Sequence, residues 1–457
     1  MRRRSDPGSR KPGSPKVELP EESEEAIALE FATLRQNDLR YVPTWRAWMI
    51  WDGASWRADL VQSVLAGVRT LTRAAADRII EQDAARSRAR SVSVASARWA
   101  EAVERLARSD PRLARGPMGW DDAPMLLATP RGVIDLSTGR LRPAEPGDYL
   151  TKLALNAPAP NATCPTWLKF LDVITGGDTD LVQYLQRVAG YCLTGETREH
   201  LLFFIHGPGR NGKSVFVSTL ASILKEHAKT APMDMLVAAH GERHPTDLAM
   251  LRGARLVVAQ ETEANRPWAA SRIKQLTGGD TITARMMRRD FFEFVPQFKL
   301  LVVGNHLPTL GRLDPALCAR IQVIPFLVTI PQDKRDKRLA EKLLREAPGI
   351  LRWAIAGCLE WQRNGLQPPE AVLNATRAYV HEADIIERWL GECCGREIGL
   401  KTGSSSLYES WSRWATAIGQ PCGSHKAFSE NLTLRGFQRC RLTGGTAGFL
   451  GLRLLRT

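Results

Sequence analysis

The segment LLFFIHGPGRNGKSVFVSTL, residues 201–220, constrains the fold of this chain more than any other. Its five leading apolar residues predict a buried strand, and the apolar side chains at helical spacing after the lysine predict a helix. Between them, Gly207, Gly212, Lys213 and Ser214 fit the pattern G-x-x-x-x-G-K-[ST]. A strand, a glycine-rich loop and a helix in this order predict an α/β fold with a polyphosphate-binding loop, or P-loop.

The residue types of this loop suit phosphate chemistry. Backbone N–H groups must approach a polyphosphate closely, and glycines leave room for that approach. The following helix directs its unpaired amides and positive dipole end at the same phosphates. Lys213 supplies a cation for the β- and γ-phosphates, and the Ser214 hydroxyl supplies a ligand of Mg²⁺. The expected contacts of ATP are Gly207, Pro208, Gly209, Arg210, Asn211, Gly212, Lys213 and Ser214. The alternative is a glycine-rich turn that binds nothing.

Two further apolar runs each end in a polar side chain. LVVAQ ends directly before Glu261, and KLLVVG ends directly before Asn305. A P-loop enzyme needs an acidic residue to hold Mg²⁺ or to polarise the attacking water, and an amide can orient that water without adding negative charge. We therefore expect Glu261 to share the metal with Ser214, and Asn305 to face the γ-phosphate.

Arg320 precedes a further apolar strand, residues 321–324. A cation in this place can act as an arginine finger, which meets the charge of the transition state and raises the rate by about 10³ to 10⁵. Arg312 is the alternative position for the finger, and a surface salt bridge is the alternative role for Arg320.

The balance of charges suits a nucleic-acid partner. The chain has 63 basic and 49 acidic residues and a net charge of +14, although solubility alone can explain such a surplus. Its eight cysteines form no C-x-x-C pair, so we expect reduced thiols in a cytoplasmic protein. No apolar run approaches membrane-spanning length, and we expect no membrane partner. His240, Glu242 and His244 lack the H-E-x-x-H spacing of a metalloprotease helix, so we expect no metal there.

Proline-containing breaks fall at residues 158–165 and 364–369, and we expect five regions along the chain. These are a disordered basic arm (1–22), an N-terminal α+β domain (23–163), an ATPase core (164–332), a helical lid or linker (333–370) and a winged-helix-like DNA-binding domain (371–457). In the N-terminal domain, we expect the tryptophan-rich residues 41–57 to be β-like and residues 133–142 to form a hairpin. We expect residues 74–115 to be helical. Their arginines either lie on a solvated helix face or line a nucleic-acid surface.

The C-terminal region has the pattern of a winged helix. Residues 407–419 and 424–434 predict two helices, and residues 437–454 predict two strands joined by a glycine-containing turn. Residues 401–457 contain eight Lys or Arg and two Glu, so the net charge is 8 − 2 = +6. We expect this region to bind DNA through Lys426, Arg435 and Arg439.

The order of these motifs resembles superfamily 3 helicases of phages, plasmids and small DNA viruses. After the glycine-rich loop come ARLVVAQETE, IKQLTGGDTITARMMRRDFFEF and KLLVVGNHLP, and this series looks like the phage/plasmid primase-helicase family in particular. MLLATPRGVIDLSTGRLRPAEPGDYLTK and the tryptophan-rich stretch before it resemble the poxvirus-type N-terminal domain that precedes these helicases. The C-terminal region is similar to the terminal winged helix of the family.

The resemblance implies a modified AAA+ fold that assembles as a ring, usually a hexamer, and moves along single-stranded DNA with ATP. Lys213 and Ser214 would bind nucleotide and metal, Glu261 would be the Walker B acid, Asn305 the sensor, and Arg320 a finger in the neighbouring subunit's site. The loop between Thr281 and Asp290 would face the central channel. Its Arg285, Arg288 and Arg289 can follow phosphates while Met286 and Met287 contact bases, although a solvated turn is the alternative.

This sequence departs from the pattern of the family at two positions. Gln260 stands where many P-loop enzymes have the first Walker B acid, so Glu263 is an alternative contributor. Ala319 stands where relatives often have another arginine, which leaves Arg320 as the better finger candidate.

The upstream region is short and lacks zinc-ligand spacing and clustered carboxylates, so we expect no primase activity in this chain. Our hypothesis is an ATP-dependent, ring-forming DNA helicase for phage, prophage or plasmid replication in the cytoplasm of a bacterial host, working with a separate primase or polymerase. The alternative is an AAA+ initiator or loader that binds origin DNA without processive unwinding. The arginine-rich loop between Thr281 and Asp290 separates the two, because only a translocating helicase requires it.

Overall fold

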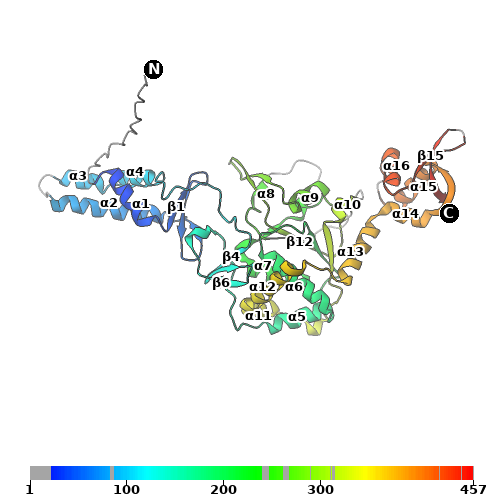
Figure 1. The fold of residues 1–457 in the computed structure, drawn as a ribbon, viewed down its shortest axis with the longest axis horizontal. Helices are drawn as coiled ribbons and strands as arrows, with labels where there is room; N and C mark the ends of the chain where they lie inside the picture. The colour runs from blue at the N-terminus through cyan, green and yellow to red at the C-terminus, as the bar shows by residue number, and fades with distance from the viewer. Residues whose placement is uncertain are drawn as a thin grey trace, which may run out of the picture. The chain divides into compact units, whose positions relative to one another are not determined.

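The structure is a computed structural model. It describes residues 22–82, 87–238, 246–260, 267–288, 290–308, 310, 314–420, 422–443 and 445–455. The chain divides into two compact units (Figure 1). Unit 1 falls within Met1–Ala123, Arg131–Val133 and Pro143–Lys152, and unit 2 within Pro124–Pro130, Ile134–Arg142 and Leu153–Thr457. The expected basic arm, apart from Glu22, and the segment with His240, Glu242 and His244 lie outside the described residues.

Unit 1 combines a helical layer with a small antiparallel sheet of order β1-β2-β3. Its elements are α1 (Glu24–Arg35), β1 (Leu39–Val42), β2 (Ala47–Trp51), β3 (Trp56–Ala58), α2 (Ser63–Gln82), α3 (Arg88–Val94), α4 (Ala97–Ala107) and the 3₁₀ turn η1 (Pro146–Asp148). Leu39 and Trp48 lie in the hydrophobic cluster that contains the helices, whereas Val42, Met49 and Trp56 lie in a second cluster. The prediction of β structure in the tryptophan-rich segment is confirmed.

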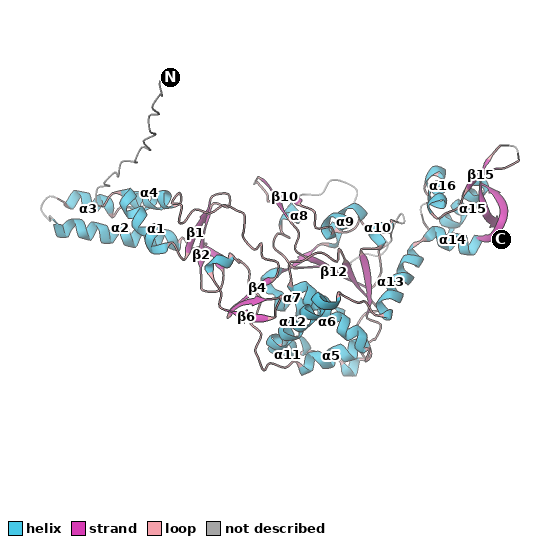
Figure 2. Cartoon of the chain, viewed as in Figure 1, coloured by secondary structure: helices cyan, strands magenta, loops and turns pink. Residues whose placement is uncertain are grey.

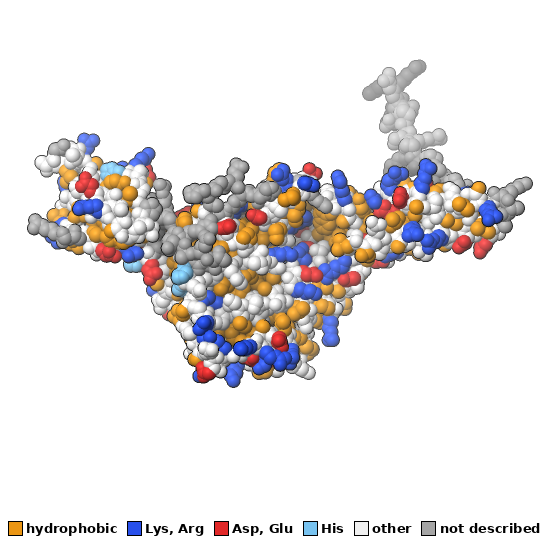
Figure 3. Space-filling model, turned by 180° about the vertical axis from the view of Figure 1, so that it is seen from behind, with side chains coloured by type: hydrophobic (Ala, Val, Ile, Leu, Met, Phe, Trp, Pro, Cys, Tyr) orange, Lys and Arg blue, Asp and Glu red, His pale blue; other side chains and the backbone are white. Residues whose placement is uncertain are grey.

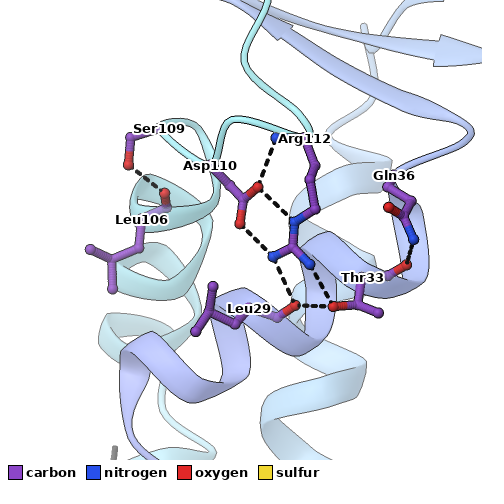
Figure 4. A network of polar contacts seen from close by, with 7 residues as sticks. All are labelled: Leu29, Thr33, Gln36, Leu106, Ser109, Asp110 and Arg112. Carbon is purple, nitrogen blue, oxygen red and sulfur yellow. Dashed lines mark hydrogen bonds and ion pairs between the residues drawn. The ribbon is translucent and has the colours of Figure 1, made fainter. Parts of the chain in front are cut away.

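Arg112 ties the chain segment after α4 to helix α1 (Figure 4). Its guanidinium donates hydrogen bonds to Asp110 at 2.6 and 2.9 Å, to Thr33 Oγ1 at 2.8 Å and to the carbonyl oxygen of Leu29 at 3.4 Å. The hydrogen bond from Arg112 lowers the pKa of Asp110. These contacts fix the place of the residues that follow Arg112, which run beside β1.

A three-stranded sheet of order β4-β5-β6 follows in the chain. It consists of β4 (Leu126–Thr129), β5 (Gly132–Asp135) and β6 (Arg140–Arg142). The hairpin predicted for residues 133–142 is confirmed. Asp135 accepts a hydrogen bond from the N–H of Ser137 at 2.9 Å, and its carbonyl oxygen accepts one from the N–H of Gly139 at 2.7 Å, which closes the turn.

Five parallel strands in the order β13-β7-β12-β9-β8 form the central sheet of unit 2. They are β7 (Leu202–His206), β8 (Ala228–Ala231), β9 (Leu256–Gln260), β12 (Lys299–Gly304) and β13 (Ile321–Pro325). Alternate residues of β7 point to opposite sides, because Phe203 and Ile205 lie in one hydrophobic cluster while Leu202 and Phe204 lie in another. Both faces are therefore covered, as expected for a parallel sheet.

Helices cover the two faces unequally (Figure 2). One cluster packs α5 (Pro165–Thr175), α6 (Thr179–Leu193), α7 (Lys213–Leu224), α11 (Leu339–Arg345) and α12 (Ala347–Asn364) against the sheet. The other contains α8 (Thr246–Ala249), α9 (Ala270–Thr277), α10 (Pro315–Cys318) and the hairpin of β10 (Ile282–Arg285) and β11 (Phe291–Phe294). The 3₁₀ turns are η2 (Lys225–His227), η3 (Met233–Met235) and η4 (Gln332–Lys334). The mixed α/β fold predicted from the sequence is confirmed.

Helix α13 (Glu370–Ala383) packs on the edge strand β13. Thr376 Oγ1 accepts a hydrogen bond from the N–H of Val323 at 3.0 Å, and the buried Tyr379 hydroxyl accepts one from Trp268 Nε1 at 2.7 Å. α13 therefore belongs to the core of unit 2, although residues 371–457 were expected to form the C-terminal domain. The expected lid or linker, residues 333–370, likewise contributes α11 and α12 to that core.

A separate hydrophobic cluster begins at Ile386. Its elements are α14 (Ile385–Cys393), β14 (Cys394–Gly403), α15 (Ser404–Ala417), α16 (His425–Leu434), β15 (Arg439–Arg441) and β16 (Ala447–Leu454), and the sheet order is β14-β16-β15. The two predicted helices and the strand–turn–strand unit are present, and α14 and β14 were not predicted. The identity of this region as a winged helix remains a prediction. Within the described chain, we find no helix that combines the length and apolar character needed to cross a membrane.

Helices α6 and α12 cross at two glycines. A Cβ on Gly190 would lie 2.0 Å from the backbone nitrogen of Cys358, and one on Gly357 would lie 2.0 Å from the carbonyl oxygen of Gln186. Real Cβ atoms do not approach backbone this closely, so any side chain here must force the two helices apart. The core of unit 2 depends on that close crossing.

We predict that Gly357→Ala destabilises the protein by about 3 kcal/mol, because overpacking at a backbone contact cannot be relieved by a side-chain rotation. The matched control is Gly391→Ala in α14, where a Cβ would have no atom within 4 Å. There alanine should stabilise by about 0.5–1 kcal/mol, as in an ordinary helix interior. Urea unfolding followed by circular dichroism measures both, and equal midpoints for the two variants would contradict the close crossing.

Candidate functional site

The glycine-rich loop lies between the end of β7 and the start of α7 (Figure 1). His206, the last residue of β7, is in register with Gly304 of β12 on one side and with Pro325 of β13 on the other. The carboxyl ends of three parallel strands therefore meet at the loop. This edge of an open α/β sheet is the place where such folds bind ligands.

Lys213 turns its amine into this loop. The residue is 5% exposed, and burial lowers the pKa of its amine. Four oxygens lie within hydrogen-bond distance of its Nζ and share its three N–H donors: the carbonyls of Gly207 at 2.6 Å and Pro208 at 3.1 Å, Asn211 Oδ1 at 3.1 Å and Asn305 Oδ1 at 3.0 Å. The amine is thus surrounded by oxygen acceptors at the carboxyl edge of the sheet, the environment that phosphate oxygens can supply.

Asn305 contacts residues on both sides of the glycine-rich loop. It lies directly after β12, yet its side chain reaches Lys213 in the helix after β7. Its carbonyl oxygen accepts a hydrogen bond from His206 Nε2 at 3.1 Å, and burial lowers the pKa of His206. Sequence reasoning missed His206. Its place, the last strand residue before Gly207, was the available signal.

Two of the three glycines are required by the geometry of the loop. Gly207 has φ +156°, and a Cβ there would lie 2.0 Å from the carbonyl oxygen of Phe326. Gly212 has φ +85°, and a Cβ there would lie 2.5 Å from Ile174 Cγ2. A Cβ on Gly209 would have no atom within 4 Å. Contacts within the fold therefore require glycine at positions 207 and 212, whereas they leave room for a side chain at position 209.

The segment after β13 braces the loop from one side. The buried Asn211 donates from Nδ2 to the carbonyl oxygen of Phe326 at 2.5 Å, and the N–H of Ile330 donates to the carbonyl oxygen of Arg210 at 3.0 Å. Arg335 in turn donates two hydrogen bonds, at 2.7 and 2.9 Å, to the carbonyl oxygen of Ile330. The shape of the loop is thus set by residues more than a hundred positions away, which the loop motif alone does not reveal.

Ser214 is the residue expected to bind Mg²⁺ through its hydroxyl, and that role remains a prediction. Its side chain is exposed in the first turn of α7, beside Lys213. Gln260 is the exposed last residue of β9, opposite Val303 of β12. Glu261 and Glu263 lie outside the described residues. Within the described chain, no group of three or more His, Cys, Asp or Glu could hold a metal ion by itself.

Arg320 directly precedes β13, the strand at one edge of the sheet. Its Nη1 donates to the carbonyl oxygen of Ala316 at 3.0 Å, and its Nε is buried without a hydrogen-bond partner. No carboxylate among the described residues forms an ion pair with Arg320, so the alternative of a surface salt bridge has no support there. Arg312, the other candidate, lies outside the described residues.

The arginine-rich segment expected to be a channel loop forms the β10–β11 hairpin. Arg285 pairs with Phe291 across the hairpin, and its guanidinium carbon lies 4.7 Å from the centroid of the Phe291 ring. Met287 is 69% exposed and Phe291 is 60% exposed, while Arg288 is exposed with φ +59°. Arg289 lies outside the described residues. Exposed apolar and basic side chains thus share one hairpin.

The three basic residues proposed for DNA binding in the C-terminal region differ in their surroundings. Lys426 in α16 and Arg439 in β15 are exposed. Arg435 is instead committed within the fold, because it forms an ion pair with Asp384 at 2.5 Å and both side chains are nearly buried, at 11% and 12% exposed. It also donates to Asn431 Oδ1 at 3.1 Å. Arg435 is therefore held by contacts within the fold, and a DNA contact through it remains a prediction.

Known proteins match two parts of the chain. Residues 28–176 match the D5 N-terminal-like domain, and residues 205–316 match a family of unknown function (DUF5906). A protein of Acanthamoeba polyphaga mimivirus, named "Putative helicase", is 27% identical over 332 residues, 67% of this chain and 34% of that protein. One of frog virus 3 (isolate Goorha) with the same name is 26% identical over 257 residues, 51% of this chain and 26% of that protein. The chain thus spans about a third of the length of these relatives or less.

A solved structure with a similar fold is the apo A form of the NrS-1 C-terminal region. Its TM-score is 0.50 at 10% identity, and the match covers 94% of this chain and 100% of that one. At this identity the likeness concerns the fold alone. Taken with the geometry above, these matches define the class as a mixed α/β protein with a parallel sheet and an N-terminal D5-like domain. Within that class, the chain matches the D5-like primase-helicase family.

We predict that Gly207→Ala and Gly209→Ala differ sharply in nucleotide binding. The first places a Cβ against the backbone of Phe326 and must open the loop, so affinity for a fluorescent ATP analogue should fall about tenfold or more, the equivalent of 1.4 kcal/mol of overpacking. The second has room for its Cβ and should keep the fold of the loop. Thermal unfolding distinguishes a local change from global loss of structure, and equal affinities would contradict this account of the loop.

Proposed function

We propose that this chain is an ATP-dependent DNA helicase motor that serves phage, prophage or plasmid replication in a bacterial host. The observation that carries the proposal is the contact between Lys213 Nζ and Asn305 Oδ1 at 3.0 Å, inside the glycine-rich loop at the carboxyl edge of the parallel sheet. A cation and an amide that meet there can act on the same phosphate. The similarity to proteins named as helicases supports the part of the proposal in which the chain acts on a nucleic acid.

The chemistry follows from the residues at the loop. ATP would place its β- and γ-phosphates against the N-terminal amides of α7 and the Lys213 amine. Asn305 would orient the attacking water at the γ-phosphate, and His206 would hold the backbone of Asn305 in place. Magnesium, when bound, neutralises charge on the phosphates, and the Ser214 hydroxyl with Glu261 would hold it. Gln260 contributes no charge, so we assign the acidic part to Glu261.

Single-stranded DNA would contact the tip of the β10–β11 hairpin. Ile282 and Ala284 are fully buried and anchor the hairpin in the core, so a force on its tip reaches the sheet that carries the ATP site. Arg285 and Arg288 can pair with phosphates, and Met287 can contact bases. Lys426 and Arg439 offer a second basic surface, suited to duplex or origin DNA.

We further propose that copies of the chain assemble head to tail as a ring, with six subunits as the expected number. The glycine-rich loop follows β7, an interior strand of the sheet, whereas Arg320 directly precedes the edge strand β13. An arginine at one edge can reach a site in another copy through a head-to-tail contact between different surface patches, and such contacts form a ring when the rotation between copies closes. The unpartnered Nε of Arg320 is consistent with a partner supplied in trans.

We predict that Lys213→Ala abolishes ATP hydrolysis and strand separation on a forked DNA substrate, because no other described cation contacts the interior of the loop. Lys169→Ala, an exposed lysine on α5, is the matched control and should keep full activity. If Lys213→Ala still hydrolyses ATP, the proposed ATP site is wrong. Forked substrates with a single 3′ or 5′ tail also report the direction of movement, and ATP turnover without any strand separation would favour the loader.

We predict that the double substitution Arg285→Ala and Arg288→Ala uncouples the two activities. ATP turnover without DNA should persist, since neither arginine contacts the glycine-rich loop, while strand separation should be lost. The salt dependence of single-strand binding should flatten by about 0.7 in log–log slope for each phosphate contact removed. Arg363→Ala is the control. That arginine is 68% exposed, forms an ion pair with Glu360 three positions before it, and lies in α12, far from the hairpin in the sequence. An unchanged slope would place the DNA elsewhere.

A further inference from the structure

The tryptophan-rich sheet of unit 1 has two faces of different chemistry. One face packs on the helices through Leu39 and Trp48. The other carries a cluster of aromatic rings and two guanidinium groups that the proposed ATP and DNA sites do not use. We refer to this set as the aromatic face, and it consists of Trp45, Trp51, Trp56, Trp120 and Tyr149 with Arg40 and Arg115.

Arg115 is held in the aromatic face by its backbone. The N–H of Tyr41 donates to the carbonyl oxygen of Leu113 at 2.8 Å, and the N–H of Arg115 donates to the carbonyl oxygen of Tyr41 at 2.9 Å. Its guanidinium carbon lies 3.4 Å from the ring centroid of Tyr149 and 5.8 Å from that of Trp120. Both the strand edge and the rings therefore fix the position of this cation.

The charge of Arg115 is not neutralised within the described chain. Its Nε is buried without a hydrogen-bond partner, and no carboxylate among the described residues forms an ion pair with it. Arg108 provides the contrast on the opposite face of the same sheet. Its guanidinium carbon lies 5.2 Å from the ring centroid of Tyr41, but it donates to both carboxylate oxygens of Glu104, at 2.6 and 2.8 Å.

Part of the aromatic face is open to solvent. Trp45 and Trp51 are half-buried, whereas Trp56 and Trp120 are buried. Two neighbouring side chains outside the face, Arg46 in the β1–β2 turn and Met118, are exposed. A guanidinium lying flat on a ring keeps the N–H groups of its edge available for a planar or tetrahedral anion. Phosphate and carboxylate both suit the paired N–H groups of a guanidinium, and indole rings stack on any base, so a nucleic-acid strand can use both kinds of group in the aromatic face.

We propose that the aromatic face binds single-stranded DNA, with a phosphate at Arg115 and bases stacked on Trp45 and Trp51. The residues of this site belong to unit 1, whereas the glycine-rich loop and the β10–β11 hairpin belong to unit 2, so the N-terminal domain would contribute its own DNA contacts. The inference rests on the proposed function in one respect, because the proposed helicase activity is what identifies the bound polymer as single-stranded DNA.

The test uses the full chain and a fluorescein-labelled dT₂₀ strand, with anisotropy measured over a range of salt concentrations and without nucleotide. Arg115→Gln should weaken binding about tenfold and lower the salt slope by about 0.7, the loss of one phosphate contact. Trp51→Leu should weaken binding to a similar extent with an unchanged slope, because stacking carries no charge. Arg108→Gln, the control from the opposite face, should bind as the unmodified chain does.

Two further measurements make the result decisive. DNA-independent ATP turnover of Arg115→Gln should equal that of the unmodified chain, so a failed ATP site and a failed aromatic face give different results. Iododeoxyuridine in the strand should crosslink to residues 45–57 or 115–120, which decides the question even if Arg115→Gln is less stable. Crosslinks confined to the β10–β11 hairpin, or affinities and slopes unchanged in both Arg115→Gln and Trp51→Leu, would overturn the proposal.

Discussion

The contact between Lys213 and Asn305 depends on the order of the strands, and the arrangement of the site depends on that contact. The two residues are 92 positions apart in the chain and meet because β12 inserts beside β7 in the parallel sheet. If another strand separated β12 from β7, the amide could not reach the lysine, which would lose one of its four oxygen acceptors. The close crossing of α6 and α12 and the packing of α13 on β13 stabilise the sheet that keeps these two strands adjacent.

The surroundings of Lys213 also bear on how a nucleotide enters. A buried ammonium group is costly unless oxygen atoms surround it, and here protein oxygens already do so. A phosphate must therefore replace some of these acceptors rather than meet a bare cation. Because Asn305 is one of them, a nucleotide that draws the amine away also releases the amide. Under the proposed function, the cation and the proposed sensor would then respond to the same event, which would couple occupancy of the site to the rest of the sheet.

The sequence allowed much of the fold to be predicted, because periodicity and glycine placement are local properties. The strand before Gly207, the helix after it, the strand before Asn305 and the tryptophan-rich sheet follow from such patterns. The support of the loop by Phe326, Ile330 and Arg335 did not, since backbone carbonyls of distant segments leave no trace in composition. The separate roles of the loop glycines are equally invisible, because whether a Cβ fits depends on neighbours that only the folded chain brings near.

Arginine shows most clearly what a sequence leaves undecided. Arg435, Arg108 and Arg115 carry the same charge and all occur in regions that a basic composition suggests for nucleic acid. Folding gives each of the first two an ion pair with a carboxylate, Asp384 for Arg435 and Glu104 for Arg108. Arg115 receives aromatic rings but no carboxylate in the described chain, so its charge remains available to an outside anion. Net charge therefore measures only the long-range attraction of DNA to the chain, while the partner of each guanidinium decides where a phosphate can be held.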